Sequence, residues 1–308
     1  MRVLITGGTG SFGGALVERL LQATDYEIVV FSRDEYKQYL MKEKFKTDRI
    51  KYVIGNIRDI NALDVVCQQN IDYIFHAAAM KHVSICEENP LEAVLTNVIG
   101  TKNVLEAAIR NKVKKVVVLS TDKAVCPQST MGQTKALAEK IALSYAKQSP
   151  TKIVITRFGN LITSRGSVLG KFINLAKEKK SLPITSYEMN RFMMGIDEAI
   201  DLVLFALNSE KSNRIFVKKA KVFNILDLAK CVNELYGNNA SIKYISKVKG
   251  ERENEWLFFN ESVIDHGDFY EIDPEGKEGI VASVSSGEQQ RETIENIKSI
   301  LLSYIENH

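Results

Sequence analysis

Short runs of aliphatic and β-branched residues alternate with longer helical patterns through the first half of the chain. The runs are nearly continuous in Val, Ile, Leu and Tyr, as expected for strands covered on both faces, and they are Val3–Thr6, Glu27–Ser32, Lys51–Gly55, Asp72–Ala77, Val113–Ser120 and Lys152–Arg157. The helical patterns between them are Phe12–Gln22, Glu35–Lys46, Ile60–Gln69, Leu91–Asn111 and Ser129–Gln148. This alternation predicts βαβ units with right-handed crossovers, and therefore an α/β fold with a doubly wound parallel sheet.

The alternation ends near residue 160, which indicates a second, smaller unit. Helical patterns continue there with shorter strands between them, at Asp197–Asn208, Asn224–Tyr236 and Glu288–Glu306. We predict a first domain over residues 1–160, with later returns to it near 184–210, and a mixed α/β C-terminal domain over 161–308. Trp256 and the following Leu257-Phe258-Phe259 are expected to fill the core of this C-terminal domain.

Charge and composition exclude several classes of protein. The 41 basic and 38 acidic residues leave a net charge of +3, without a basic block, which disfavours nucleic-acid binding. No run approaches the roughly 18 apolar residues of a membrane span, and the chain opens on a strand pattern rather than on a leader. The four cysteines lack metal-ligand spacing, as in chains with reduced thiols. We expect a cytoplasmic protein without a metal site.

A glycine-rich turn connects the first strand to the first helix, in the segment Thr6-Gly7-Gly8-Thr9-Gly10-Ser11-Phe12-Gly13. Gly7, Gly10 and Gly13 stand at G-x-x-G-x-x-G spacing. Glycines here allow a tight turn, close approach of backbone N–H groups to a pyrophosphate and close packing of helix on strand, and the helix N-terminus favours phosphate charge. At the first strand–helix junction of a βαβ series, the pattern predicts a dinucleotide site in a Rossmann-type domain.

The end of the second strand discriminates between cofactors. NAD-binding chains usually place an acidic residue there to hold the ribose 2′-hydroxyl, whereas this chain has Ser32 and Arg33. A guanidinium suits a 2′-phosphate, so we predict NADP. In the alternative interpretation Arg33 is solvated surface and Asp34 or Glu35 serves the ribose.

The fifth strand ends in Ser120-Thr121-Asp122-Lys123, and the helix after it carries Met131-Gly132-Gln133-Thr134-Lys135. At this point the chain resembles the extended short-chain dehydrogenase/reductase family, whose mark is a Ser or Thr after this strand and Tyr-x-x-x-Lys on the next helix. Thr121 matches the hydroxyl residue and Lys135 the lysine, but Met131 occupies the tyrosine position. A thioether has no proton to exchange, so one interpretation is a chain that only binds the nucleotide.

Further motifs narrow the resemblance to the nucleotide-sugar 4,6-dehydratase branch, and above all to the UDP-N-acetylglucosamine 4,6-dehydratases of surface-polysaccharide synthesis. Met131 and Arg-Phe-Met-Met point to the C-5-inverting members, while Asn56 stands where the branch usually has aspartate. The similar motifs are Phe31–Glu35, Phe75–Val83, Asn97-x-x-Gly100-Thr101, Arg157–Asn160, Ser164–Val168, Arg191–Met194 and Gly250-Glu251-Arg252 with Glu255.

The resemblance implies a lyase that uses NADP to oxidise sugar carbon 4, eliminates water across carbons 5 and 6, and returns the hydride to carbon 6. Asp122 would protonate the departing hydroxyl, and a neutral Lys123 would remove the carbon 5 proton; alternatively the two form an ion pair that shapes the loop. With Met131 in place, the carbon 4 hydroxyl proton has three candidate acceptors: water through Thr121, a deprotonated Lys135, or Asp122.

The resemblance also implies the remaining contacts and partners. Residues 1–160 would bind NADP and 161–308 mainly the substrate, a UDP-N-acetylhexosamine, for capsule or O-antigen synthesis by a dimer or hexamer. The expected cofactor contacts are Gly7, Thr9, Gly10, Ser11, Phe12, Gly13, Ser32, Arg33, Asn56, Ile57, Ala77, Ala78, Ala79, Lys81, Asn97 and Lys135. The expected substrate contacts are Lys81, Asn160, Ser164, Arg165, Val168, Arg191, Arg252 and Glu255, where each arginine alone could equally be solvated surface.

Two other functions remain open at this point. The same fold supports UDP-sugar 4-epimerases and 4-reductases, although an epimerase has no use for the adjacent Asp122 and Lys123. A non-catalytic NADP-binding sensor or scaffold is the second alternative.

Overall fold

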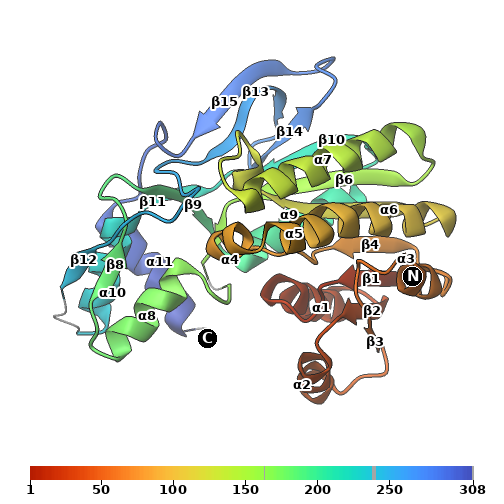
Figure 1. Ribbon diagram of the computed structural model, residues 1–308, viewed down its shortest axis with the longest axis horizontal. Coiled ribbons are helices and arrows are strands. Elements are labelled where there is room, and N and C mark those ends of the chain that lie inside the picture. Colours follow the sequence, from red (N-terminus) through yellow and green to blue (C-terminus); the bar gives the residue numbers. More distant parts are fainter. Residues whose placement is uncertain (163, 238–240, 307–308) are drawn as a thin grey trace.

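The computed structural model describes residues 1–162, 164–237 and 241–306. Its centre is a ten-stranded sheet in the order β15-β13-β14-β10-β6-β5-β4-β1-β2-β3 (Figure 1). The seven strands from β3 to β10 are parallel, so the predicted doubly wound α/β fold is confirmed. They are β1 (Arg2–Thr6), β2 (Glu27–Ser32), β3 (Ile50–Ile54), β4 (Tyr73–His76), β5 (Lys115–Thr121), β6 (Lys152–Phe158) and β10 (Arg214–Lys218).

Helices cover both faces of the parallel part, because successive residues of its strands point to opposite faces. In β1, Leu4 packs beneath one layer of helices, and Val3 and Ile5 pack beneath the other. The first layer contains α3 (Ile60–Cys67), α6 (Gly100–Arg110) and α7 (Thr130–Gln148). The second contains α1 (Ser11–Ala23), α2 (Glu35–Phe45) and α9 (Ile196–Asn208).

Three antiparallel strands extend the sheet beyond β10, at the top of Figure 1. They are β13 (Trp256–Asp265), β14 (Phe269–Asp273) and β15 (Ile280–Ser285). The expectation for the apolar run at the start of β13 is wrong: Leu257 and Phe258 pack into the core of the large sheet, and Phe259 is exposed. The cause is that β13 joins the large sheet, where a register shift between Trp256 and Phe258 breaks the alternation of side chains, so that the adjacent Leu257 and Phe258 both reach that core.

A separate lobe at the left of Figure 1 has its own apolar core. Its strands form two small sheets, β11-β9-β7 and β12-β8. The elements are β7 (Asn160–Leu161), β8 (Leu182–Ile184), β9 (Asn190–Met194), β11 (Lys221–Asn224), β12 (Ile242–Tyr244), α8 (Val168–Lys177), α10 (Ile225–Leu235) and α11 (Ile294–Glu306). The domain division at residue 160 stays a prediction, since the chain beyond it contributes α9, β10 and β13–β15 to the large sheet and its cover.

Short helical turns complete the chain beside the carboxyl ends of β4 and β5. They are α4 (Val83–Glu88), α5 (Pro90–Ala93), the π-helical turn η1 (Val94–Ile99) and the 3₁₀ turn η2 (Asp122–Ala124). In the described ranges no helix has both the length and the apolar character that crossing a membrane requires.

Candidate active site

A cavity of about 1130 Å³ opens at the carboxyl ends of β1, β2, β4 and β5, where the strand order reverses and doubly wound folds bind ligands. Most of the predicted site residues line it: Gly7, Thr9, Gly10, Ser11, Phe12, Gly13, Ser32, Arg33, Asn56, Ile57, Ala77, Ala78, Ala79, Lys81, Thr121, Lys123, Met131, Lys135, Asn160, Ser164, Arg165 and Val168. A second cavity of about 360 Å³ adjoins it and is lined by Lys123, Asn160, Val168, Arg191, Arg252 and Glu255. Asp122 and Asn97 line neither of these two cavities.

The glycine-rich turn is packed too closely for side chains at two of its positions. Gly7 has a φ of +70°, and a Cβ there would lie 2.8 Å from the Cα of Ala78. A Cβ on Gly13 would lie 2.5 Å from the carbonyl oxygen of Gly7. Gly10 caps α1 without a side-chain hydrogen bond, and the first turn of α1 carries no acidic residue. The helix N-terminus is thus free to receive an anion.

A buried histidine, which the sequence analysis did not assign to the site, holds the turn against β4. His76 Nδ1 lies 2.7 Å from Thr6 Oγ1, and His76 Nε2 lies 3.0 Å from Thr101 Oγ1. Burial, together with the charge of Lys135, lowers the pKa of His76 to about 3. The ring is therefore neutral at physiological pH, and it connects β1, β4 and α6 without adding charge beside the cofactor turn.

The end of β2 brings both a guanidinium and a carboxylate to the cavity, since Arg33 and Asp34 line it. Asp34 caps α2, accepting from Lys37 N at 3.0 Å and pairing with Lys37 Nζ at 2.6 Å. Ser32 is buried and accepts a hydrogen bond from Gln38 Nε2 at 3.0 Å. Arg33 and Lys37 line the cavity. Lys37 is a second cation that sequence reasoning missed, although its place in the first turn of the helix predicted from Glu35 was a signal.

Asn97 interrupts the helix predicted over 91–111 with the π-helical turn η1. Its Oδ1 accepts from Met80 N at 2.8 Å, and its Nδ2 donates to Met80 O and to Thr134 Oγ1, each at 3.0 Å. The side chain thus ties the loop after β4 to the first turns of α7. Asn97 thus positions the loop and the helix that form part of the cavity wall, without lining the cavity itself.

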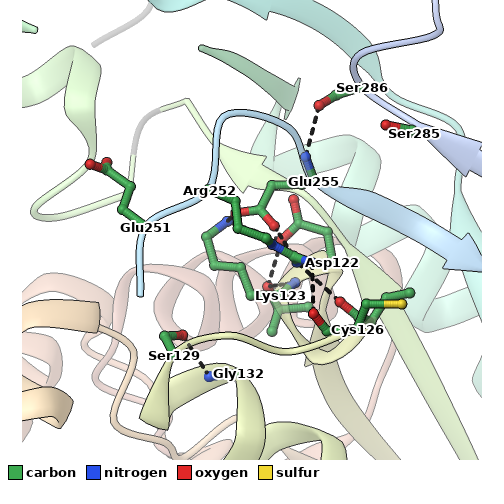
Figure 2. A network of polar contacts seen from close by, with 12 residues as sticks. Asp122, Lys123, Cys126, Ser129, Gly132, Glu251, Arg252, Glu255, Ser285 and Ser286 are labelled. Carbon is green, nitrogen blue, oxygen red and sulfur yellow. Dashed lines mark hydrogen bonds and ion pairs between the residues drawn. The ribbon is translucent and has the colours of Figure 1, made fainter. Parts of the chain in front are cut away.

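Asp122 and Lys123 follow Thr121 at the end of β5. Asp122 is fully buried, and its Oδ1 accepts from Thr121 Oγ1 at 2.9 Å. Oδ1 also accepts from Lys123 Nζ at 3.0 Å (Figure 2). Its Oδ2 is buried without a hydrogen-bond partner among the described residues. Burial raises the pKa of Asp122, and the charge of Glu255 raises it further against the opposing effect of Lys123. Burial therefore favours the protonated form of Asp122, and Thr121 and Lys123 connect it to the cavity that they line.

Met131 lies on the first turn of α7 at the cavity wall, with only 4% of its surface exposed. It packs with Cys86 and Ala93, and Met80 and Val83 pack partly against the same cluster. The wall beside the end of β5 is therefore apolar at Met131.

Lys135 lies one turn further along α7 and also lines the cavity. It is buried, and its Nζ donates to the carbonyl of Leu119 at 2.6 Å. Burial lowers the pKa of Lys135 to about 8, against the opposing charge of Glu139. The ammonium is thus held at the cavity in a state that loses its proton readily.

A loop from the small lobe crosses the glycine-rich turn. The guanidinium of Arg165 donates to the carbonyl of Thr9 at 2.5 Å, and Arg165 N donates to Ser11 Oγ at 3.0 Å. Lys81 Nζ donates to the Arg165 carbonyl at 2.6 Å. Two cations therefore lie beside the glycine-rich turn.

The remaining predicted substrate residues contact protein groups. The Arg191 guanidinium is buried among the carbonyls of Asn190, Arg252 and Glu253. The Arg252 guanidinium donates to the carbonyls of Val125 and Cys126, at 3.0 and 2.8 Å. Their role in substrate binding stays a prediction.

The family follows from comparison with known proteins. The model of a family described as "Polysaccharide biosynthesis protein" matches residues 3–274. The chain belongs to this family. The sequence-based assignment to the extended short-chain dehydrogenases/reductases of polysaccharide biosynthesis is therefore confirmed.

Individual members of the family and of the fold are similar to the chain over most of its length. A UDP-glucose 4-epimerase of Rickettsia canadensis is 39% identical, over 98% of this chain and 95% of its own. One of Rickettsia prowazekii is 43% identical over 90% of this chain and 84% of its own. The X-ray structure of Pen from Bacillus thuringiensis superposes with a TM-score of 0.93 at 39% identity and covers 98% of this chain and 97% of its own. At 21% identity and a TM-score of 0.78, a dTDP-glucose 4,6-dehydratase of Streptomyces venezuelae, solved with NAD and TYD bound, shares the fold over 100% of this chain and 98% of its own.

Proposed function

We propose that this family member catalyses the NADP-dependent 4,6-dehydration of a UDP-N-acetylhexosamine. UDP-N-acetylglucosamine is the first candidate substrate and a UDP-4-keto-6-deoxy sugar the product, with inversion at carbon 5 as the further expectation from Met131. The observation that best supports dehydration is the pair at the end of β5. Lys123 lines the cavity, and burial raises the pKa of the adjacent Asp122. An elimination needs one acid and one base side by side.

The residues around the cavity fit a dinucleotide. A Cβ would fill the cradle at Gly7 and Gly13, the N-terminus of α1 would receive the pyrophosphate, and Arg33 with Lys37 would bind a 2′-phosphate. Of the alternative ribose partners, Glu35 is absent from the cavity lining. Asp34 lines the cavity, but its carboxylate caps α2 and pairs with Lys37. When bound, the nicotinamide supplies hydride acceptance from carbon 4 and hydride return to carbon 6.

The cofactor choice is tested by Arg33→Ala. Removing a charge-assisted contact to phosphate, worth about 1.5–3 kcal/mol, raises the Kd for NADP at least about tenfold. The Kd for NAD stays nearly unchanged, because NAD lacks the 2′-phosphate. Binding of the two nucleotides is measured by calorimetric titration. An equal increase of both Kd values would support the alternative interpretation, in which Arg33 is solvated surface.

The reaction needs three proton transfers, and each is assigned to a different side chain. A neutral Lys135 accepts the carbon 4 hydroxyl proton, which its pKa of about 8 favours. Lys123 in its neutral form removes the carbon 5 proton, which oxidation at carbon 4 has acidified. Asp122 supplies the proton for the departing hydroxyl through Thr121, whose side chain lines the cavity. The Thr121 hydroxyl, which donates to Asp122 Oδ1 at 2.9 Å in the structure, would turn to give its proton to the departing group and take one from Asp122.

A second candidate, UDP-sugar 4-epimerisation, is favoured by the names of relatives that are 39–43% identical to this chain. An epimerase returns the hydride to carbon 4 and eliminates nothing, so it gives Asp122 and Lys123 no task. A protein that binds NADP without turnover is the third possibility.

One experiment separates the three. The purified chain is incubated with NADP and either UDP-N-acetylglucosamine or UDP-glucose, without reductant, and the sugar nucleotides are analysed by mass spectrometry and chromatography. Dehydration is expected to yield a product lighter by one water. A new sugar nucleotide of unchanged mass would establish epimerisation instead. Unaltered substrates together with measurable NADP binding would favour the non-catalytic protein.

A further inference from the structure

The segment that precedes β13 packs against the loop between β5 and α7 and forms hydrogen bonds with it. Arg252 binds the carbonyls of Val125 and Cys126 in that loop. Gly250, with a φ of +79°, packs so closely that a Cβ would lie 2.8 Å from the Cα of Ser129, the cap of α7. More than a hundred residues of chain separate the two segments, yet they lie face to face (Figure 2).

Glu255 is the acidic centre of this contact. It is only 3% exposed. Its Oε2 pairs with the Arg252 guanidinium at 2.5 Å, and its Oε1 lies 3.6 Å from Lys123 Nζ (Figure 2). The backbone is fixed as well, since Glu255 N donates to Ser286 Oγ at 2.9 Å. Contacts of both the side chain and the backbone therefore fix the position of the Glu255 carboxylate in the substrate-free protein.

Lys123 consequently lies among several fixed polar groups. Asp122 Oδ1 and Asn160 Oδ1 accept from its Nζ, at 3.0 and 2.9 Å, with Glu255 slightly further away. The charged groups around the cluster are Asp122 on η2, Arg191 on β9, and Arg252 and Glu255 on the segment before β13. Burial alone would raise the pKa of Glu255, but Lys123, Arg191 and Arg252 together hold it below its usual value. Glu255 is thus a permanent anion beside the Asp122–Lys123 pair.

We propose that Glu255 is a positioning residue for the elimination, which holds Lys123 at the cavity and stabilises the ammonium that forms when Lys123 takes the carbon 5 proton. The proposal rests on the dehydration proposed above and replaces the expectation that Glu255 binds the sugar. In the step, the carbon 5–H bond breaks, its proton moves to Lys123 Nζ, and the electron pair forms the double bond as the hydroxyl leaves with a proton from Asp122. The charge of Glu255 opposes ionisation of Asp122 in the same arrangement.

The pH profile of dehydration tests this role. Without the carboxylate, Asp122 loses its proton more readily, because the charge of Glu255 raises the pKa of Asp122, so the limb of the profile that follows Asp122 moves to lower pH. Glu255→Gln is expected to shift the profile to lower pH by about one unit and to lower kcat about tenfold at the wild-type optimum, with little change in KM. Glu255→Asp, which keeps the charge at a greater distance, is expected to give a smaller shift. The matched control is Glu253→Gln, since the Glu253 side chain is exposed and pairs with Lys247.

Three results would overturn the proposal. A raised KM with an unshifted profile would mean that Glu255 contacts the sugar. An equal loss at every pH would mean a purely structural role. An unaltered enzyme would mean no role. Should Glu255→Gln fail to fold, the comparison of Glu255→Asp with wild type decides between the same outcomes.

A second readout separates failure of this inference from failure of the proposed reaction. Lys123 is labelled competitively with acetic anhydride across pH in the substrate-free protein, and the Lys123 peptide is quantified by mass spectrometry. Loss of Glu255 is expected to speed labelling, because Lys123 Nζ loses the anionic partner that lies 3.6 Å away. Unchanged labelling overturns the role of Glu255 even if dehydration occurs. Faster labelling in a protein without dehydratase activity would support the contact between Glu255 and Lys123 and would contradict the proposed dehydration.

Discussion

Met131 limits the proton chemistry available at the wall of the cavity. Its thioether can neither give nor take a proton, and it is packed into the cluster with Cys86 and Ala93. We therefore treat it as an apolar surface for the sugar or the nicotinamide.

If Met131 is only an apolar surface, Met131→Leu is expected to keep turnover within about threefold and to cost less than about 1.5 kcal/mol in unfolding free energy, because the exchange conserves volume. Met131→Tyr places a larger, polar group in the same cluster and is expected to lower stability by about 1–3 kcal/mol. Urea unfolding and product formation are measured for both. A Tyr variant with unchanged or higher turnover would show that ordinary hydroxyl chemistry still fits the site.

Lys135 is the residue whose protonation should govern sugar oxidation. Burial lowers its pKa to about 8, so the neutral form that accepts a proton becomes more populated as pH rises toward that value. The single-turnover rate of nicotinamide reduction is expected to increase with pH and to level off above about 8.

Lys135→Arg supplies the control for that pH dependence, because arginine keeps its proton throughout the range. We expect the oxidation rate to fall about 100-fold or more while NADP binding, followed by calorimetry, is retained. A rising pH limb that survives in the Arg variant would assign the proton to Thr121 or Asp122.

At the scale of elements, the first six strands could be predicted because each is a continuous apolar run that ends near the observed residue. Their alternation with helices predicts that Gly7, Arg33, Ala77 and Thr121 lie at one edge of the sheet, and in the structure all four line one cavity. The π-helical turn at Asn97 had only a weak signal, an amide within a helical run, since its cause is a tertiary contact with Met80.

The junction of β1 with α1 offers a matched pair of glycines. A Cβ on Gly13 would meet the backbone of Gly7 at 2.5 Å and of Gly8 at 2.6 Å, whereas one on Gly14 would meet only Met41 Cε at 3.5 Å. Gly13→Ala is expected to lower the unfolding free energy by about 1–3 kcal/mol and to weaken NADP binding. Gly14→Ala is expected to be neutral or to stabilise α1 by up to about 1 kcal/mol. Similar denaturation midpoints for the two variants would contradict close packing as the reason for Gly13.

At the scale of the whole molecule, the contacts between distant segments could not be predicted from the sequence. Local pattern assigned Leu257 and Phe258 to the small lobe, but β13 returns to the large sheet and carries them into its core. The same return brings Glu255 to Lys123. Neither contact has a signature in spacing or periodicity, because each depends on how the chain crosses the sheet after residue 160.

A buried ion network also joins β13 to the catalytic half of the molecule. Arg157 on β6 pairs with Glu139 on α7 and with Glu261 on β13, each at 2.8 Å, and it donates to the carbonyl of Leu257 at 3.0 Å. Arg157 and Glu139 are buried, so removing one partner leaves an uncompensated charge in the interior.

Arg157→Met is therefore expected to lower the unfolding free energy by about 3–5 kcal/mol. The double variant Arg157→Met/Glu139→Met removes the stranded carboxylate as well, and it should recover a large part of that loss, since Glu261 is partly exposed and can be hydrated. The double-mutant cycle, measured by urea unfolding, isolates the coupling between the two residues. If the double variant is as unstable as the single one, the loss comes from packing around the guanidinium, and the network does not join β13 to α7 by charge.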